Sequence, residues 1–128
     1  MVKIKKDVPI LMCNRPTING RIYPKQEVEI AITKINNPPL LGMFGPQEGL
    51  AINLGEVAFI AENLKFNDFN GLEADIRTLE TPKGQILNPI LDLCEFTTVG
   101  TGTIGMDGVI SDFKISYISA NAKPATSR

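Results

Sequence analysis

The chain has 128 residues, of which 43% are hydrophobic and 21% are charged, and its formal net charge is −1. This composition is typical of a globular protein with one core, so we expect a single domain over residues 1–128. The near-even charge balance excludes a strongly basic surface, and no apolar run reaches the roughly 20 residues of a membrane span. We therefore expect neither nucleic acid nor a membrane as a partner.

The sequence contains no histidine. Ser-His-Asp and Cys-His sites need an imidazole base near neutral pH, and zinc sites usually need histidine or several cysteines. The two cysteines, Cys13 and Cys94, form neither a spaced metal motif nor a disulfide framework. We predict two buried thiols in a reducing compartment, and no metal or cofactor.

The first part of the chain predicts a strand, a turn, a helix and a loop. Residues 3–13 predict a strand whose lysines are typical of a sheet edge, and the Asn-Gly pair at 19–20 predicts a turn. A helix is expected from Pro24, where a missing N–H costs little, to the Asn-Asn-Pro-Pro stop at 36–39. Residues 40–54 are rich in Gly and Pro and predict a loop that holds at most one short strand.

The middle of the chain predicts a hairpin followed by a helix. Residues 57–79 alternate on both sides of a turn at 67–71, which is typical of a β-hairpin. The segment 85–93 has apolar residues at helical spacing, and Pro89 inside it predicts a short or kinked helix.

The last part of the chain predicts strands and a tail. Residues 96–105 are β-branched and rich in glycine, which predicts two strands that meet at a bend. The Asp-Gly pair at 107–108 predicts a hairpin turn, and residues 109–119 predict the strand that follows it. The polar residues 121–128 are expected to form a flexible tail.

Three local patterns are similar to those of functional sites, but in each case a structural interpretation is favoured. Glu73 and Asp75 alternate on one predicted strand face, and such acids usually lie on a solvated surface. Cys94 has no basic neighbour that would activate its thiol, so we interpret it as buried filler. Residues 100–105 have the Gly-x-Gly-x-x-Gly spacing of a dinucleotide site, but no helix follows, which favours close strand packing or a barrel corner.

The order of several segments resembles the bacteriophage prohead maturation proteases, which share the fold of herpesvirus assembly proteases. The most specific piece is NGRIYP at 19–24, leading into a helix; GMFGP at 42–46 is similar to the loop that carries the family's catalytic histidine. LETPKGQIL at 79–87, FTTVGTG at 96–102 and DGVISDF at 107–113 resemble the later turn, nucleophile strand and closing hairpin. The resemblance implies a mainly β fold with flanking helices (α+β), built on a mostly antiparallel, barrel-like sheet.

The same resemblance shows where the chain departs from the family. Gly45 stands in place of the histidine, Thr97 in place of the nucleophilic serine, and Val99 in place of the arginine that helps bind the oxyanion. Base, nucleophile and oxyanion support are all altered, so we expect no catalytic residues. The expectation is therefore a pseudoprotease, a protease scaffold without enzymatic activity.

This interpretation leads to a non-enzymatic phage virion protein, most simply a capsid decoration or cement protein that binds the major capsid protein. It would lie in the virion capsid after assembly in the host cytoplasm, and lattice symmetry favours a dimer or trimer. Candidate contacts are Met43, Phe44 and Leu50, unless these residues close the core. Two alternatives remain: a maturation protease with a rewired site, using Thr97 or Cys94 with a carboxylate or lysine base, and a scaffold-core component that leaves after assembly.

Overall fold

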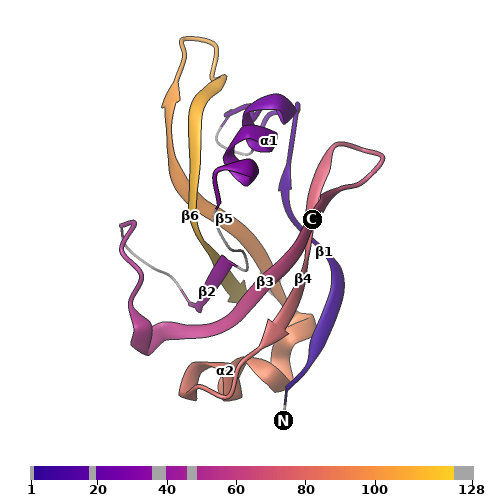
Figure 1. Cartoon of the computed structure of the whole chain (residues 1–128), viewed down its shortest axis with the longest axis vertical. Coiled ribbons are helices and arrows are strands. Elements are labelled where there is room, and N and C mark those ends of the chain that lie inside the picture. The colour runs from indigo at the N-terminus through magenta and orange to yellow at the C-terminus, as the bar shows by residue number, and fades with distance from the viewer. Residues whose placement is uncertain (1, 18–19, 36–39, 46–48, 123–128) are drawn as a thin grey trace.

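The computed structural model describes residues 2–17, 20–35, 40–45 and 49–122 (Figure 1). In chain order the elements are β1 (Ile4–Met12), α1 (Lys25–Thr33), β2 (Leu40–Phe44), the 3-10 helix η1 (Leu54–Glu56), β3 (Val57–Phe66), β4 (Gly71–Thr78), α2 (Pro82–Leu87), the 3-10 helix η2 (Asn88–Leu93), β5 (Cys94–Ile104) and β6 (Ile110–Ala122). The predicted helix after Pro24, the hairpin around 67–71 and the turn at Asp107–Gly108 are all confirmed.

One sheet with the strand order β1-β4-β3-β2-β6-β5 contains all the strands of the described chain. Neighbouring strands are antiparallel except β2 and β6, which are parallel. The sheet curls into a half-barrel, so that its two edge strands, β1 and β5, come into contact (Figure 1). The predicted fold class, mainly β with flanking helices and a barrel-like sheet, is confirmed.

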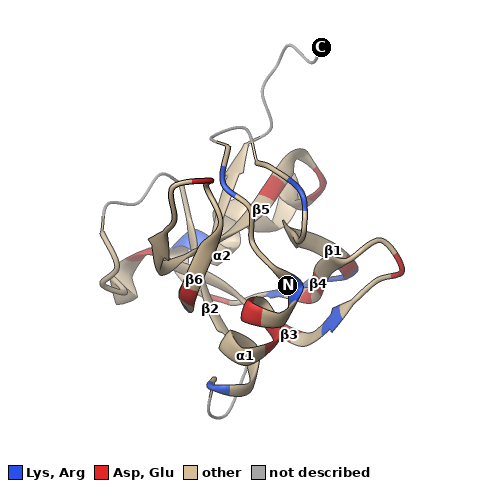
Figure 2. Cartoon of the chain, turned by 90° about the horizontal axis from the view of Figure 1, so that it is seen from above, with Lys and Arg blue, Asp and Glu red and all other residues tan. Residues whose placement is uncertain are grey.

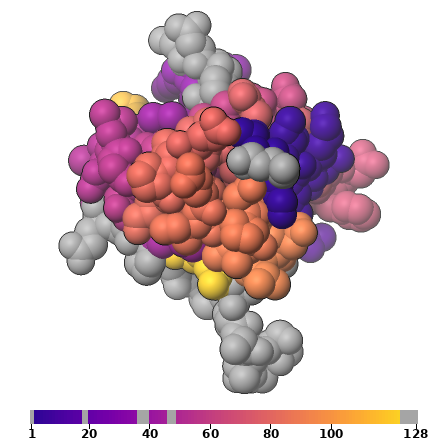
Figure 3. Space-filling view, turned by 90° about the horizontal axis from the view of Figure 1, so that it is seen from below, coloured from indigo at the N-terminus to yellow at the C-terminus, as the bar shows by residue number. Residues whose placement is uncertain are grey.

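The helices cover the open parts of the half-barrel. α1 packs against β6 and buries Val28 and Ala31 in the main core. α2 and η2 lie across the lower end of the barrel, beside the first residues of β1 (Figure 3). Acidic and basic residues are interspersed over the elements rather than gathered by sign (Figure 2).

The two faces of the sheet have separate apolar clusters. Inside the half-barrel the rings of Phe59 and Phe96 meet edge to face, with 5.3 Å between their centroids. A smaller cluster of Met43, Val57 and Tyr117 lies on the outer face. Tyr117 belongs to this outer cluster and its neighbour Ile118 to the main core, as expected for adjacent residues of one strand.

The helix predicted over 85–93 begins earlier and ends differently. Thr81 is its N-cap, because the Thr81 hydroxyl accepts a hydrogen bond from the Gly84 N–H at 3.0 Å. Pro82 then occupies the first helical turn, where it is tolerated. After Leu87 the chain continues as the 3-10 helix η2, and its backbone leaves helical geometry at Ile90. The predicted kink near Pro89 is confirmed.

The glycine-rich segment after residue 95 forms one strand, β5, and the prediction of two strands at a bend is wrong. Its pairing with β6 shifts register after Val99 and again after Thr101. β-Bulges at these two points therefore change the direction of one continuous strand, where we expected a bend between two strands. A Cβ atom at Gly100 would lie 1.8 Å from the backbone oxygen of Lys114. Close strand packing, the other interpretation of these glycines, is therefore correct.

The end of the chain also differs from the prediction. β6 continues to Ala122, so Asn121 and Ala122 are strand residues and not part of a tail. The remainder of the predicted tail, 123–128, lies outside the described residues.

Asp75 is buried, so the prediction that it lies on a solvated surface is wrong. Its side chain accepts hydrogen bonds from the Asn63 amide at 2.9 Å and from the Asp7 N–H at 3.1 Å. Asp7 and Asn63 both have positive φ, 57° and 55°, at bulges of β1 and β3. One carboxylate thus holds the two bulges that flank β4. Strand alternation in the sequence does not reveal such bulges, which turn polar groups toward Asp75.

The hydrogen bonds from Asn63 and from the Asp7 backbone lower the pKa of Asp75. Because the folded-state pKa is depressed, the ionised carboxylate stabilises the fold above its unfolded pKa, and this stability is lost as pH falls through the folded pKa. We predict that Asp75→Asn lowers the free energy of unfolding at pH 7 by about 2 kcal/mol and weakens its dependence on acid pH. Urea unfolding over a series of acid pH values checks this, with the exposed Asp68→Asn as control. Equal acid dependence in Asp75→Asn and wild type would contradict it.

Candidate functional site

The parallel pairing of β2 with β6 brings the predicted site positions together. Thr97 of β5 pairs with Ser119 of β6, and Val99 pairs with Tyr117. Gly45 follows β2, and its carbonyl oxygen lies 3.4 Å from the Ser119 hydroxyl that donates to it. Gly45 and Thr97 therefore lie on opposite sides of Ser119, and the three sequence-predicted positions occupy one region of the sheet.

Four polar residues share the outer face of β5 and β6 here, and we call them the outer patch: Glu95, Thr97, Ser119 and Asn121. Glu95 pairs with Asn121 as Thr97 pairs with Ser119, and residues paired across antiparallel strands point to the same face. The Asn121 amide donates a hydrogen bond to the Ser119 hydroxyl at 3.0 Å. Glu95 and Thr97 are exposed, whereas Ser119 is only 5% exposed. A carboxylate and an accessible hydroxyl therefore lie two residues apart on one strand face.

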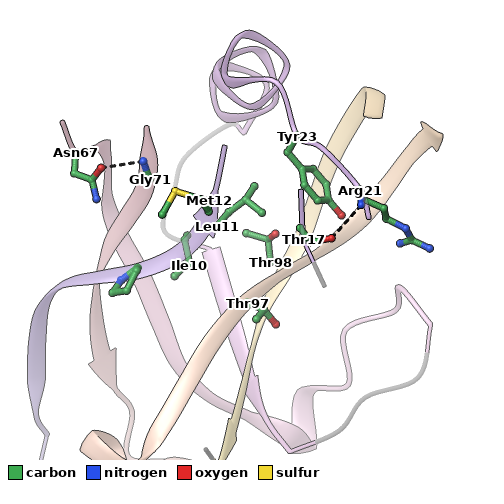
Figure 4. A pocket seen from close by; sticks show the side chains of 11 residues that line it. Ile10, Leu11, Met12, Thr17, Arg21, Tyr23, Asn67, Gly71, Thr97 and Thr98 are labelled. Atoms are coloured by element: carbon green, nitrogen blue, oxygen red, sulfur yellow. Dashed lines mark hydrogen bonds between the residues drawn. The ribbon is translucent and has the colours of Figure 1, made fainter. Parts of the chain in front are cut away.

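A cavity of about 410 Å³ opens between β1 and β5 beside this patch (Figure 4). Thr97 and Thr98 line it from β5, and residues 9–12 line it from β1. Thr17 and Tyr23 complete one wall, while the Arg21 guanidinium points away from Thr97 in Figure 4.

Two smaller cavities extend the first along β5. One of about 140 Å³ lies beside Cys94, Glu95 and Phe96, and one of about 190 Å³ lies beside residues 100–102 and Ile104. Together the three cavities follow β5 over most of its length, and we call them the β5 groove. In the described chain, β5 pairs only with β6, so alternate backbone N–H and C=O groups of β5 face this groove. An unpaired strand edge of this kind accepts an extended peptide as an added strand.

The two cysteines are buried and form no disulfide, as predicted. Burial raises the pKa of the Cys13 thiol to about 11, so this thiol stays protonated at neutral pH. Cys94 begins β5 and is only 2% exposed, so its sulfur is much less accessible than the hydroxyl of the exposed Thr97. Of the two nucleophiles considered for a rewired site, Thr97 is the accessible one.

The candidate capsid contacts divide by burial. Met43 is 0% exposed and packs in the outer cluster, so it has no surface with which to contact a partner. Phe44 is half-buried against the main core. Leu50 is 45% exposed, and Ile52 and Leu54, which follow closely in the sequence, are also exposed; the sequence interpretation named only Leu50.

Within the described residues we searched for clusters of metal-ligating side chains and for helices that could span a membrane. Among these residues, no group of three or more Cys, Asp or Glu side chains is arranged to hold a metal ion. The described helices are all too short or too polar to cross a bilayer.

No protein-family model matches the chain, and no curated protein matches it. The curled sheet with its flanking helices is instead recognised by structure: the chain has a phage capsid-protease-like fold. The solved structure of the bacteriophage T4 capsid assembly protease, gp21, matches with a TM-score of 0.74. The match covers 95% of this chain and 92% of that chain at 19% sequence identity. The expected prohead-protease fold is therefore confirmed.

The expectation of a pseudoprotease is corrected by this comparison, because the solved structure that shares the fold is a protease. That expectation rested on the missing histidine at Gly45 and on the changes at Thr97 and Val99. It did not consider the outer patch, in which Ser119 and Asn121 come from a strand that pairs with β5. The alternation of residues 109–119 indicates the face of Ser119, whereas Asn121 lies in the predicted tail; only the register with β5 places Ser119 opposite Thr97.

The close approach of β5 and β6 at Gly100 predicts that a larger residue there destabilises the fold. Because a Cβ atom there would lie 1.8 Å from the Lys114 backbone oxygen, Gly100→Ala must separate the strands. We expect Gly100→Ala to lower the free energy of unfolding by about 3 kcal/mol, measured by urea denaturation. Gly55→Ala is the control, since its Cβ would meet its nearest neighbour at an ordinary 3.4 Å. Equal stability of the two variants would contradict the packing argument.

Proposed function

We propose that the chain is a protease of phage capsid assembly, with a rewired site that cleaves extended segments of a capsid or scaffold precursor. The observation that carries the proposal is the position of Thr97, an exposed hydroxyl that lines the β5 groove on the same strand face as the Glu95 carboxylate. The fold likeness to a capsid assembly protease supports the assembly context.

The β5 groove supports an extended peptide as substrate. A segment added to the free edge of β5 pairs its backbone with the N–H and C=O groups that face the groove. Thr97 is the fourth of the 11 residues of β5, so the peptide extends to both sides of the bond next to this hydroxyl. The cavity walls formed by residues 9–12 and Tyr23 are mainly apolar and receive side chains from the inner face of the peptide.

The outer patch then supplies the reacting groups. The Thr97 oxygen attacks the peptide carbonyl carbon while its proton passes to the Glu95 carboxylate. The C–N bond breaks, Glu95 returns the proton to the leaving amine, and the acyl group remains as an ester on Thr97. Water, deprotonated by Glu95, hydrolyses that ester and restores the Thr97 hydroxyl. Backbone N–H groups of β5 that face the groove are the donors for the developing oxyanion.

Ser119 and Asn121 act as positioning residues beneath Thr97. Ser119 is buried, so it does not reach a substrate, but it lies opposite Thr97 in the strand pairing. The Asn121 amide and the Gly45 carbonyl fix both the oxygen and the proton of Ser119. This arrangement holds the middle of the site in one geometry, which a hydroxyl nucleophile with a carboxylate base requires.

The proposal predicts a specific loss of cleavage. Wild-type protein incubated with the capsid and scaffold precursors of its phage releases defined fragments, which are measured by mass spectrometry. We expect Thr97→Ala to reduce kcat/KM at least about a thousandfold and Glu95→Gln about a hundredfold or more, because they remove the nucleophile and the base.

Thr103→Ala is the matched control, since Thr103 is an exposed threonine on the same strand outside the outer patch. It should cleave as wild type does. The proposal fails if wild type releases no fragment, or if Thr97→Ala releases the same fragments at the same rate.

A second role, attachment to the major capsid protein as a decoration or cement protein, is favoured by the exposed apolar side chains of Leu50, Ile52 and Leu54. These three large apolar residues are 45%, 40% and 77% exposed within five positions of the chain. Exposed apolar residues that gather in this way commonly mark a protein interface. Such a role places the protein in the virion as well as in the assembling particle.

Quantitative mass spectrometry of purified phage particles tests this second role. The role predicts a copy number comparable to that of the major capsid subunit. It also predicts that a variant with serine at 50, 52 and 54 is lost from the particles. A copy number far below that of the capsid subunit would exclude the cement role.

A further inference from the structure

A cavity of about 350 Å³ lies between the last turn of α1 and the middle of β6. Its walls are Ala31, Ile35 and Ile115, which are apolar, and Lys34 and Lys114, which are basic. It shares no lining residue with the β5 groove, so it is a separate feature of the molecule. Its volume is within the lower part of the range of small-ligand pockets and suits an occupant the size of one amino-acid residue.

The charges at this cavity are of one sign. The lining includes two lysines and no acidic residue. Neither lysine belongs to the ion pairs found in the described chain, which involve Lys5, Lys6, Lys65, Arg77 and Lys83. The Glu27 carboxylate, one to two turns earlier on α1, accepts a hydrogen bond from the Asp112 N–H at 3.0 Å and does not line the cavity. An anion bound in this cavity would meet two positive charges and no carboxylate of the lining.

The lining therefore suits an occupant with two properties, a negative charge at the lysines and an apolar body against the other three residues. Aspartate and glutamate side chains offer the negative charge but no apolar group of sufficient size. The last residue of a polypeptide offers both when it is leucine, isoleucine or valine, because its carboxylate and its apolar side chain leave the same Cα atom. Lysine ammonium groups are suitable partners for such a carboxylate.

We propose that this cavity, which we call the α1–β6 pocket, binds the C-terminal residue of a partner polypeptide that ends in an aliphatic side chain. Lys34 and Lys114 hold the terminal carboxylate, and Ala31, Ile35 and Ile115 hold the side chain. The proposal does not rest on proteolysis, because the pocket contains no residue of the outer patch.

A nuclear magnetic resonance titration of the full chain tests the proposal. The probe is an acetylated Gly-Ser-Gly-Ser-Gly-Leu peptide with a free carboxylate, compared with the same peptide as its C-terminal amide and with free leucine. We expect the free-acid peptide to shift the backbone resonances of 31–35 and 114–115, and to bind at least about tenfold more tightly than the other two probes. Equal binding of the amide excludes carboxylate recognition, and equal binding of leucine excludes a polypeptide occupant.

Variants assign the effect to the two lysines. Lys34→Met and Lys114→Met keep an unbranched side chain and remove the charge, and each should weaken the free-acid peptide about fivefold. The matched control is Lys3→Met with Arg15→Met, two exposed cations outside the pocket, which should leave the affinity unchanged. Equal losses in the control pair, or resonance shifts confined to the β5 groove, would overturn the proposal.

Discussion

The parallel pairing of β2 with β6 is the contact on which the rest of this fold depends. Only three residue pairs make it, from Gly42 opposite Ile118 to Phe44 opposite Ala120, yet they join β1, β4 and β3 to β6 and β5 in one sheet. Gly42 is required at this point, because a Cβ atom there would lie 2.1 Å from the ring of Phe59. That ring in turn packs edge to face on Phe96 of β5, so the core fixes the same joint from inside the half-barrel.

The joint explains why the two ends of the sheet meet without pairing. A sheet that curls through a short parallel contact brings β1 and β5 into contact, but no strand pairing joins them among the described residues, and the β5 groove lies along this seam. A strand edge left open in this way is usually a hazard, and here it lies beside an accessible hydroxyl and a carboxylate. The same pairing puts Gly45, Ser119 and Thr97 in one row. The β2–β6 pairing therefore determines both the curl of the sheet and the arrangement of residues in the proposed site.

Local signals in the sequence predicted most elements, whereas contacts between distant segments were beyond them. The helix start at Pro24 and the hairpin around 67–71 follow from neighbouring residues, and both predictions were correct. The bulges that bury Asp75 depend on strands far apart in the chain, so alternation alone gave the wrong answer. The candidate site was half predictable: the family resemblance pointed to Gly45 and Thr97. Ser119 and Asn121 needed the register of β6 with β5, so the sequence interpretation weighed only the changes at Gly45, Thr97 and Val99.

The most direct measurement of the central claim is chemical labelling of the native protein with a fluorophosphonate, which modifies activated hydroxyl nucleophiles, followed by peptide mapping. An activated Thr97 beside Glu95 predicts one adduct, on the Thr97 oxygen, which is absent in Glu95→Gln. Thr98 and Ser119 serve as internal references, because one lies next to Thr97 and the other opposite to it. An unlabelled protein, or adducts spread over several hydroxyls without dependence on Glu95, would contradict the account.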